Sequence, residues 1–140
     1  MPNWGQIFRR IRKSEEAPLT GAPAVRREKS YSALSGYVYQ YFYNGHRRSK
    51  REHEPGDEFV FIVRTAHGNS CPVPVFVSDA AVGGWETDHD RLLSATERYA
   101  VAKMALFQAF DERSSPAVMG EAVHVRAADL SLILETLGLE

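Results

Sequence analysis

Residues 37–51 read YVYQYFYNGHRRSKR, and this stretch decides what fold to expect. Tyrosines stand on alternate positions in its first half, and a period of two places one set of side chains on each face of a β-strand. Tyr37, Tyr39, Tyr41 and Tyr43 therefore share one face. An Asn-Gly pair and a cluster of Arg and Lys follow them. The stretch predicts a strand with a tyrosine-rich face that leads into a basic segment.

The tyrosine-rich face has two interpretations. Aromatic side chains can stack on the bases of a single nucleic-acid strand, with about 1 to 3 kcal/mol per base, and Arg47 and Arg48 would then contact its phosphates. Tyrosine is also common on a half-exposed sheet face that contacts only water or protein. Residues 46–58 hold four basic and four acidic side chains, which weakens the case for a phosphate clamp. We favour a protein-partner surface made by the four tyrosines with Arg47 and Arg48.

The Asn-Gly pair at positions 44 and 45 is typical of a two-residue hairpin turn. Such a turn requires the next strand to begin near His46, whereas the strong apolar alternation resumes only at Glu58. The sequence therefore predicts either a long charge-balanced connection or a hairpin whose first part is polar and projects beyond the core.

Two further apolar runs follow the tyrosine strand. Residues 58–65, EFVFIVRT, are apolar on both faces, which predicts a central strand covered on both sides. Residues 72–78, PVPVFVS, are rich in β-branched side chains and predict a third strand. Because proline has no N–H to donate, Pro72 and Pro74 place this strand at a sheet edge or restrict its hydrogen bonds to one side.

The second half of the chain predicts a long central helix. Residues 79–90 contain Gly83 and Gly84 and are expected to form a loop. A helix of about six turns follows and ends near Arg113; it begins either at Asp90 or at the S-x-x-E capping box that starts at Ser94. Apolar side chains cover most of its circumference, so its middle should be buried.

The C-terminal residues complete the predicted sheet and helix layer. Residues 122–126 read as a short fourth strand, and residues 129–137 as a last helix with one apolar face. The whole order predicts a single α+β domain over residues 31–140. Its mostly antiparallel sheet has three to four strands, in the order β-β-β-α-β-α, with the helices packed on one face.

The N-terminal residues form a separate unit in this scheme. Residues 1–13 predict a short basic amphipathic helix, and residues 14–30 have the composition of a linker. The apolar stripe of the helix can close the protein's own core, dock on a partner or lie on an anionic membrane surface. Its docking residues are Trp4, Ile7, Phe8 and Ile11.

Composition limits the class of protein. The chain has 140 residues, of which 44% are apolar, and its single cysteine, Cys71, cannot form an internal disulfide. There is no secretory apolar segment and no run of about 20 apolar residues that would cross a bilayer, so we expect a cytoplasmic protein. Up to Arg51 the chain has 11 Lys or Arg and 3 acidic residues, and after it 6 and 15. This asymmetry suits an anionic partner or mutual attraction between the two halves of one fold.

Catalytic signals are weak. His67 lies four residues before Cys71, and His89 stands between two aspartates, but neither arrangement has the ligand set of a metal site. Lys103 is the one ionisable residue in an apolar helical stretch, and we expect it at the rim of the core. The common nucleotide, metalloprotease and hydrolase motifs are absent. We expect no catalytic residues, no metal and no cofactor.

The sequence thus favours a small non-catalytic interaction module that binds a protein partner or a second copy of itself. The first alternative is binding of single-stranded nucleic acid or an anionic surface through the tyrosine strand and the basic N-terminal third. The second alternative is a small enzyme with a pocket near His67, Cys71 and His89.

Overall fold

The computed structural model describes residues 17–64, 69–113 and 115–139. The predicted amphipathic helix, with Trp4, Ile7, Phe8 and Ile11, lies outside the described residues. The elements are β1 (Lys29–Ser32), β2 (Val38–Arg51), β3 (Glu54–Arg64), β4 (Ser70–Ser78), α2 (Asp79–His89), α3 (Ala95–Glu112), a 3-10 turn (Pro116–Val118), β5 (Val123–Val125) and α4 (Ala127–Thr136).

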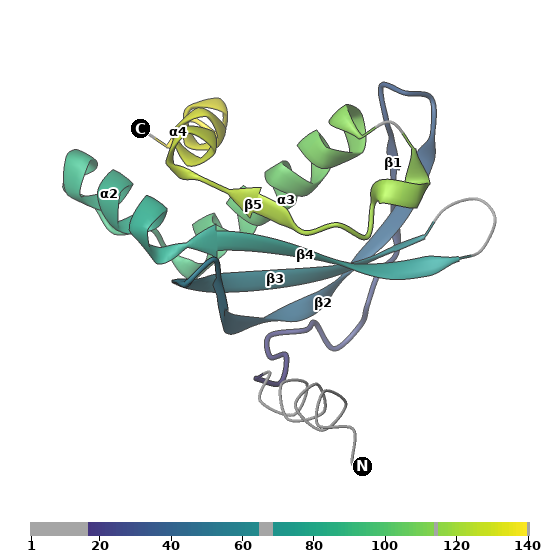
Figure 1. The fold of residues 1–140 in the computed structure, drawn as a ribbon, viewed down its shortest axis with the longest axis horizontal. Helices are drawn as coiled ribbons and strands as arrows, with labels where there is room; N and C mark the ends of the chain where they lie inside the picture. The colour runs from purple at the N-terminus through teal and green to yellow at the C-terminus, as the bar shows by residue number, and fades with distance from the viewer. Residues whose placement is uncertain (1–16, 65–68, 114, 140) are drawn as a thin grey trace, which may run out of the picture.

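Five strands form one sheet in the order β1-β2-β3-β4-β5, and the helices gather on one face of it (Figure 1). Neighbouring strands are antiparallel except β4 and β5, which are parallel. The predicted α+β class is confirmed. The predicted numbers of strands and of helices in the domain were too low, because the sheet has a fifth strand, β1, and the helices include α2. β1 was missed because its sequence, KSYS, is mostly exposed and shows no apolar alternation. It begins at Lys29, two residues inside the stretch that was expected to be linker.

The loop predicted over residues 79–90 is wrong, because these residues form helix α2. The hydroxyl of Ser78 accepts a hydrogen bond from the backbone of Ala81 at 3.1 Å and caps the helix. Gly83 and Gly84 each cost about 1 kcal/mol relative to alanine in a helix interior. Burial of Trp85, which is 5% exposed, and of two smaller apolar side chains offsets that cost. The expected capping box at Ser94 is present at the start of α3.

Strands β2 and β3 form one long hairpin. Its turn is Glu52–His53, and both residues have positive φ values of 52° and 68°, as a type I′ turn requires. Gly45 instead lies at a β-bulge, where the pairing shifts between Tyr43 and Gly45. The predicted alternative of a hairpin with a polar first part describes this arrangement, and the Asn-Gly pair marks the bulge.

The prolines of β4 explain how this strand is shared between two neighbours. Pro72 and Pro74 lie opposite Ile62 and Val60 of β3. β5 pairs with β4 only from Val75 onward. The strand is therefore not at the edge, but its prolines lie where pairing is one-sided, as expected.

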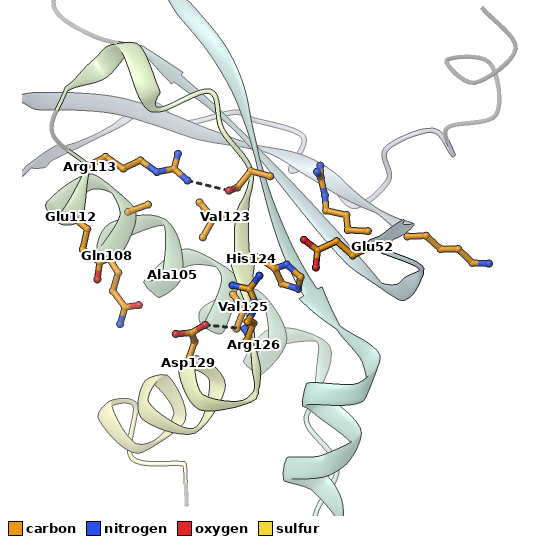
Figure 2. Close-up of a pocket in the computed structure, with 14 residues that line it drawn as sticks. Glu52, Ala105, Gln108, Glu112, Arg113, Val123, His124, Val125, Arg126 and Asp129 are labelled. Atoms are coloured by element: carbon orange, nitrogen blue, oxygen red, sulfur yellow. Dashed lines mark hydrogen bonds between the residues drawn. The ribbon is translucent and has the colours of Figure 1, made fainter. Parts of the chain in front are cut away.

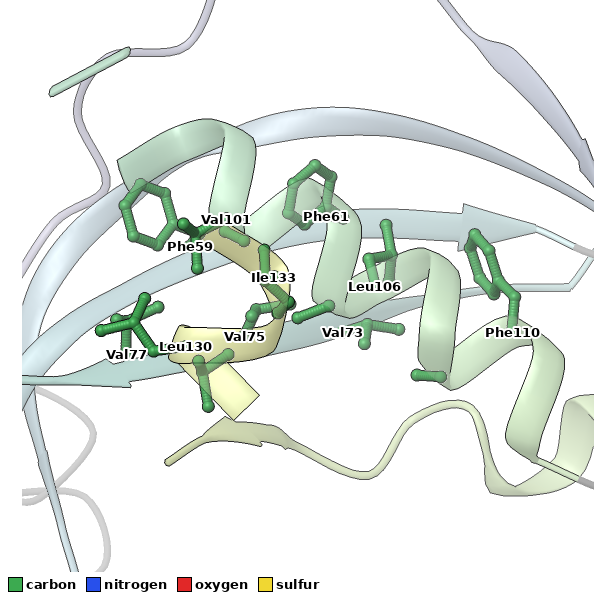
Figure 3. Close-up of a cluster of buried hydrophobic side chains, with 14 of the residues drawn as sticks. Phe59, Phe61, Val73, Val75, Val77, Val101, Leu106, Phe110, Leu130 and Ile133 are labelled. Carbon is green, nitrogen blue, oxygen red and sulfur yellow. The ribbon is translucent and has the colours of Figure 1, made fainter. Parts of the chain in front are cut away.

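The core fills the space between the sheet and helices α3 and α4 (Figure 3), and α2 adds Val82 and Trp85 to it. Phe61 and Val75 of the sheet and Leu106 and Phe110 of α3 are fully buried there. Each such side chain contributes about 1.5 to 3 kcal/mol on burial. No helix of the described residues is long and apolar enough to cross a membrane.

Candidate functional site

The predicted tyrosine-rich surface is largely closed by helix α3. Tyr39 and Tyr41 are 0% and 5% exposed, and the ring of Tyr39 stacks on Phe110 at 4.5 Å between centroids. Tyr43 is half-buried against Tyr99 at 4.8 Å. Desolvation by burial raises the pKa values of Tyr39, Tyr41 and Tyr43, and that of Tyr43 reaches about 12. The proposed surface of four tyrosines is therefore reduced: Tyr39 and Tyr41 belong to the core, whereas Tyr37 is 45% exposed and Tyr43 is partly exposed.

The two arginines assigned to the same surface have acidic neighbours. Arg47 lies 3.6 Å from Glu58, across the hairpin. Arg48 donates to Asp57 at 3.0 Å and also pairs with Asp79 at the start of α2. The hydrogen bond from Arg48 lowers the pKa of Asp79. These contacts join the basic end of β2 to the acidic residues that follow it, as the charge balance of residues 46–58 suggested.

The residues proposed for an enzyme pocket occupy separate environments. Cys71 lines a small cavity beside Met119 and Gly120. The ring of His89 stacks on Trp85 at 4.2 Å. Lys103 lies 5.8 Å from the ring of Phe107, and desolvation by burial together with Lys29 lowers its pKa. His67 lies outside the described residues. Among the residues that the structure describes, no group of three His, Cys, Asp or Glu side chains could hold a metal ion.

A groove of about 670 Å³ follows strand β5 (Figure 2). β5 is the last strand of the sheet and has β4 on one side only. Its other edge faces the groove. The lining residues come from the β2–β3 hairpin, α3, β5 and the start of α4: Lys50, Arg51, Glu52, Ala105, Gln108, Ala109, Glu112, Arg113, Ala122, Val123, His124, Val125, Arg126 and Asp129.

The groove has two different walls. Helix α3 contributes Ala105 and Gln108 to one wall (Figure 2), together with Ala109. The small side chains of the two alanines let another chain approach. The opposite wall comes from the end of the hairpin, at Glu52 (Figure 2) and its neighbour Arg51. β5 runs between the two walls, so side chains on either face of an adjacent strand would meet one wall each.

Arg113 fixes the chain that leads into β5. Its guanidinium donates hydrogen bonds to the carbonyl oxygens of Val118 at 3.2 Å, Met119 at 3.1 Å, Glu121 at 2.8 Å and Ala122 at 3.2 Å. Desolvation by burial lowers the pKa of Arg113. One side chain therefore contacts four carbonyl groups in the segment between α3 and β5. From the sequence, Arg113 was predicted only as the last residue of a helix. No local pattern predicts that its side chain contacts residues five to nine positions later.

The start of α4 closes one end of the groove. The backbone N–H of Arg126 donates to Asp129 Oδ2 at 3.0 Å (Figure 2). This contact turns the chain sharply from β5 into α4 and leaves the Arg126 side chain exposed. Four basic residues line the groove against three acidic ones: Lys50, Arg51, Arg113 and Arg126 against Glu52, Glu112 and Asp129.

Comparisons with known proteins give no relative for this chain: no protein-family model, no curated protein and no solved structure matches it significantly.

Proposed function

We propose that the protein is a small non-catalytic interaction module that binds an extended segment of a partner protein as an added strand on β5. The observation that carries the proposal is the open edge of β5 inside a groove with two walls. Strand addition to an exposed sheet edge is a recurrent mode of peptide recognition, in which main-chain hydrogen bonds give affinity and alternate side chains give specificity.

The features that protect the two edges of the sheet from pairing with another chain also support strand addition at β5. Exposed edges are commonly blunted by proline, by charges on the edge or by a covering loop. The other edge strand of the sheet is β1, whose four residues KSYS include the charged Lys29. Beyond the end of β1, Thr20 covers the edge of β2, and its backbone exchanges hydrogen bonds of 2.9 and 2.8 Å with His46. β5 has the sequence VHV, without proline or a formal charge, so it lacks two of the features that commonly protect an edge.

The walls of the groove define the chemistry of the added segment. Side chains that face α3 would lie against Ala105 and Ala109, so small or medium apolar residues fit there. The excess of basic residues along the groove, with Arg126 exposed, favours an acidic residue at the end near α4. We therefore expect an extended segment that combines apolar residues on one face with an acidic residue.

The alternative of nucleic-acid or anionic-surface binding has less support. Stacking of nucleic-acid bases requires accessible tyrosine rings, and α3 covers Tyr39 and Tyr41. Phosphate binding requires free cations, and Arg48 pairs with Asp57 and Asp79. Docking through residues 1–13 stays a prediction that the described residues do not address.

Selection of a displayed library of random 12-residue peptides against the full chain tests the proposal. The selected peptide should be synthesised and its contacts mapped by amide hydrogen exchange and chemical-shift changes. We expect new protection at alternate amides of β5, those that point away from β4, and chemical-shift changes at Ala105 and Ala109. Arg126→Glu should weaken binding of an acidic peptide about fivefold, since a charge reversal at an interface removes about 1 kcal/mol.

Arg27→Glu is the matched control, because Arg27 is exposed, lies outside the groove and changes the net charge equally. It should leave the affinity within about twofold, in keeping with a screened, distant charge. Gln108→Trp places a large side chain at an exposed position of α3 in the groove and should abolish binding. The proposal is wrong if the selection yields no binder, or if the bound peptide protects another edge of the sheet and tolerates Gln108→Trp.

A further inference from the structure

A second cavity lies away from the β5 groove, between the middle of the β2–β3 hairpin and the start of α3. Its volume is about 490 Å³, and none of its lining residues is shared with the β5 groove. The residues that line it are Gly21, Tyr43, His46, Asp57, Phe59, Ala95, Thr96, Arg98 and Tyr99. We propose that this cavity binds a small aromatic molecule that carries a neutral hydrogen-bond donor. The proposal stands independently of peptide binding at β5.

Aromatic side chains from three elements form its walls. The rings of Tyr43 and Tyr99 meet at 4.8 Å with an interplanar angle of 59°. The rings of His46 and Phe59 lie 5.8 Å apart at an angle of 38°. Phe59 is almost fully buried, whereas the other three rings are partly exposed and available to a ligand. Tilted and offset arrangements at such distances are those that aromatic rings prefer, so a planar ligand ring would find favourable partners.

The ring of His46 is held in place before any ligand arrives. Its Nδ1 lies 2.9 Å from the hydroxyl of Tyr43, and its backbone pairs with Thr20. Gly21 follows with φ of +79° and passes so close that a Cβ there would lie 2.6 Å from His46 Cε1. Only glycine fits at that position without displacing the ring. The segment that contains Thr20 and Gly21 thus fixes one wall, and a preorganised wall lowers the entropic cost of binding.

The polar groups of the cavity select a neutral donor. Asp57 Oδ1 already accepts from Arg48 at 3.0 Å. Asp57 Oδ2 lies 3.6 Å from Arg98 Nη1, which is too long for a hydrogen bond, so this oxygen retains capacity to accept one. The adjacent charges of Asp57 and Arg98 oppose each other. A cation would therefore be repelled by Arg98 and an anion by Asp57, whereas an N–H or O–H group on an aromatic ring gains a partner without that penalty.

Indole and benzothiophene make a matched pair of probes, because they share a bicyclic shape and only indole has an N–H donor. Titration of the full chain with each, followed by chemical-shift changes, should show saturable binding of indole with shifts at Gly21, Tyr43 and Tyr99. Benzothiophene should bind about tenfold more weakly, the ratio expected for loss of one hydrogen bond to a charged carboxylate. Equal affinity for the two probes, or no saturable binding at millimolar indole, would overturn the proposal.

Two variants locate the site. Tyr99→Leu keeps apolar volume but removes the ring and should weaken indole binding about fivefold or more, in line with the energy of an aromatic pair. Tyr37→Leu is the control. Tyr37 is exposed and does not line the cavity, so this substitution should leave indole binding unchanged. If Tyr99→Leu does not fold, Thr96→Trp provides the test, because Thr96 is exposed at the cavity and a tryptophan there would fill it. Indole binding that survives Thr96→Trp would place the ligand elsewhere and contradict the proposal.

Discussion

The two halves of strand β2 differ in chemistry although they form one continuous strand. Before Gly45, Tyr39 and Tyr41 are buried against α3. After it, Arg47 and Arg51 lie on the opposite face and contact Glu58. The first half therefore belongs to the core, and the second half joins strands through ion pairs.

The bulge at Gly45 explains how one strand serves both purposes. Tyr43 lies opposite Phe61, and His46 lies opposite Phe59, so two residues of β2, Asn44 and Gly45, stand against the single residue Val60 of β3. Odd-numbered residues face the helices before the bulge, and even-numbered residues face them afterwards. The period of two that places the tyrosines correctly thus fails at Asn44, and the difference between the halves can be tested at each of them.

Truncation in the aromatic half should have the largest effect. Tyr39→Ala removes a ring that is 0% exposed and stacks on Phe110, so we expect a loss of about 3 to 5 kcal/mol in the free energy of unfolding. Tyr37→Ala changes the same residue type two positions earlier, where the side chain is 45% exposed. It should cost less than about 0.5 kcal/mol. Urea denaturation of both variants measures the contrast, and similar losses would show that the tyrosines are not divided between core and surface.

Tyr39→Phe separates the ring from its hydroxyl. Among the described residues, the buried Tyr39 hydroxyl has no hydrogen-bond partner. Its removal should leave stability unchanged or raise it by about 1 kcal/mol, because a buried unsatisfied hydroxyl is costly. A clear loss of stability in this variant would indicate that the hydroxyl is hydrogen-bonded in solution.

The contrast between the two halves of β2 also shows which features of the fold can be predicted from the sequence. The alternation of tyrosines correctly placed them on one face, and the apolar residues of 58–65 correctly predicted a central strand, which lies between β2 and β4. The expected cover on both faces is incomplete, because Ile62 is only partly buried. Which face α3 would cover depends on contacts between residues about 70 positions apart, such as Tyr39 with Phe110. A pattern within one strand contains no such information, so the most conspicuous side chains were assigned to a surface rather than to the core.

The candidate sites were less accessible to sequence reasoning than the fold. The β5 groove depends on Arg113 reaching four carbonyl groups and on a hairpin end that meets the β5 region. The second cavity joins Gly21, which lies in the presumed linker, to Tyr99 of α3. Such convergence follows from the complete topology, since none of these residues has a neighbour of similar chemistry in the sequence. Helix α2 was missed for a related reason. Its two glycines have low helix propensity, and the burial of Trp85 that offsets this is visible only in the folded structure.

Substitution at the bulge should have an intermediate effect. Gly45 has φ of +119°, and a Cβ there would lie 2.7 Å from the carbonyl oxygen of Thr20. Gly45→Ala should therefore cost about 2 kcal/mol, from the backbone conformation and from displacement of the segment that pairs with His46. Thermal or urea unfolding measures the loss, and hydrogen exchange at Thr20 and His46 should increase.

Gly84→Ala is the control for the bulge. Gly84 lies within helix α2, and a Cβ there would meet no atom within 4 Å. Alanine should stabilise the helix by about 0.5 to 1 kcal/mol. Opposite signs at the two glycines are the expected result, and a stabilising Gly45→Ala would mean that the bulge is not the constraint that separates the halves of β2.

Substitution of Glu58, which pairs with the charged half of β2, should have the smallest effect on the free energy of unfolding, and this effect should depend on pH. Glu58 is 3% exposed, accepts a hydrogen bond from Arg51 at 2.9 Å and lies 3.6 Å from Arg47. Burial alone would raise the pKa of Glu58, but hydrogen bonds from Arg51 and Ser49 outweigh it and leave the pKa below its usual value of 4.5. Glu58→Gln should destabilise the protein by about 1 kcal/mol at pH 7, because the neutral amide can still accept from Arg51 but no longer carries the charge opposite to that of the arginine.

The direction of the pH dependence follows from the lowered pKa of Glu58. A carboxylate that binds its proton more weakly in the folded state contributes stability above the unfolded pKa, and this contribution is lost as the pH falls through the folded pKa. The difference between the original chain and Glu58→Gln should therefore be full at pH 7 and shrink steadily below pH 4.5, since protonated glutamate resembles glutamine. Glu54→Gln, at an exposed position of the same strand, should change stability by less than about 0.5 kcal/mol at either pH. A Glu58→Gln effect that stays constant down to acid pH would show that the charge of Glu58 does not hold the second half of β2 to β3.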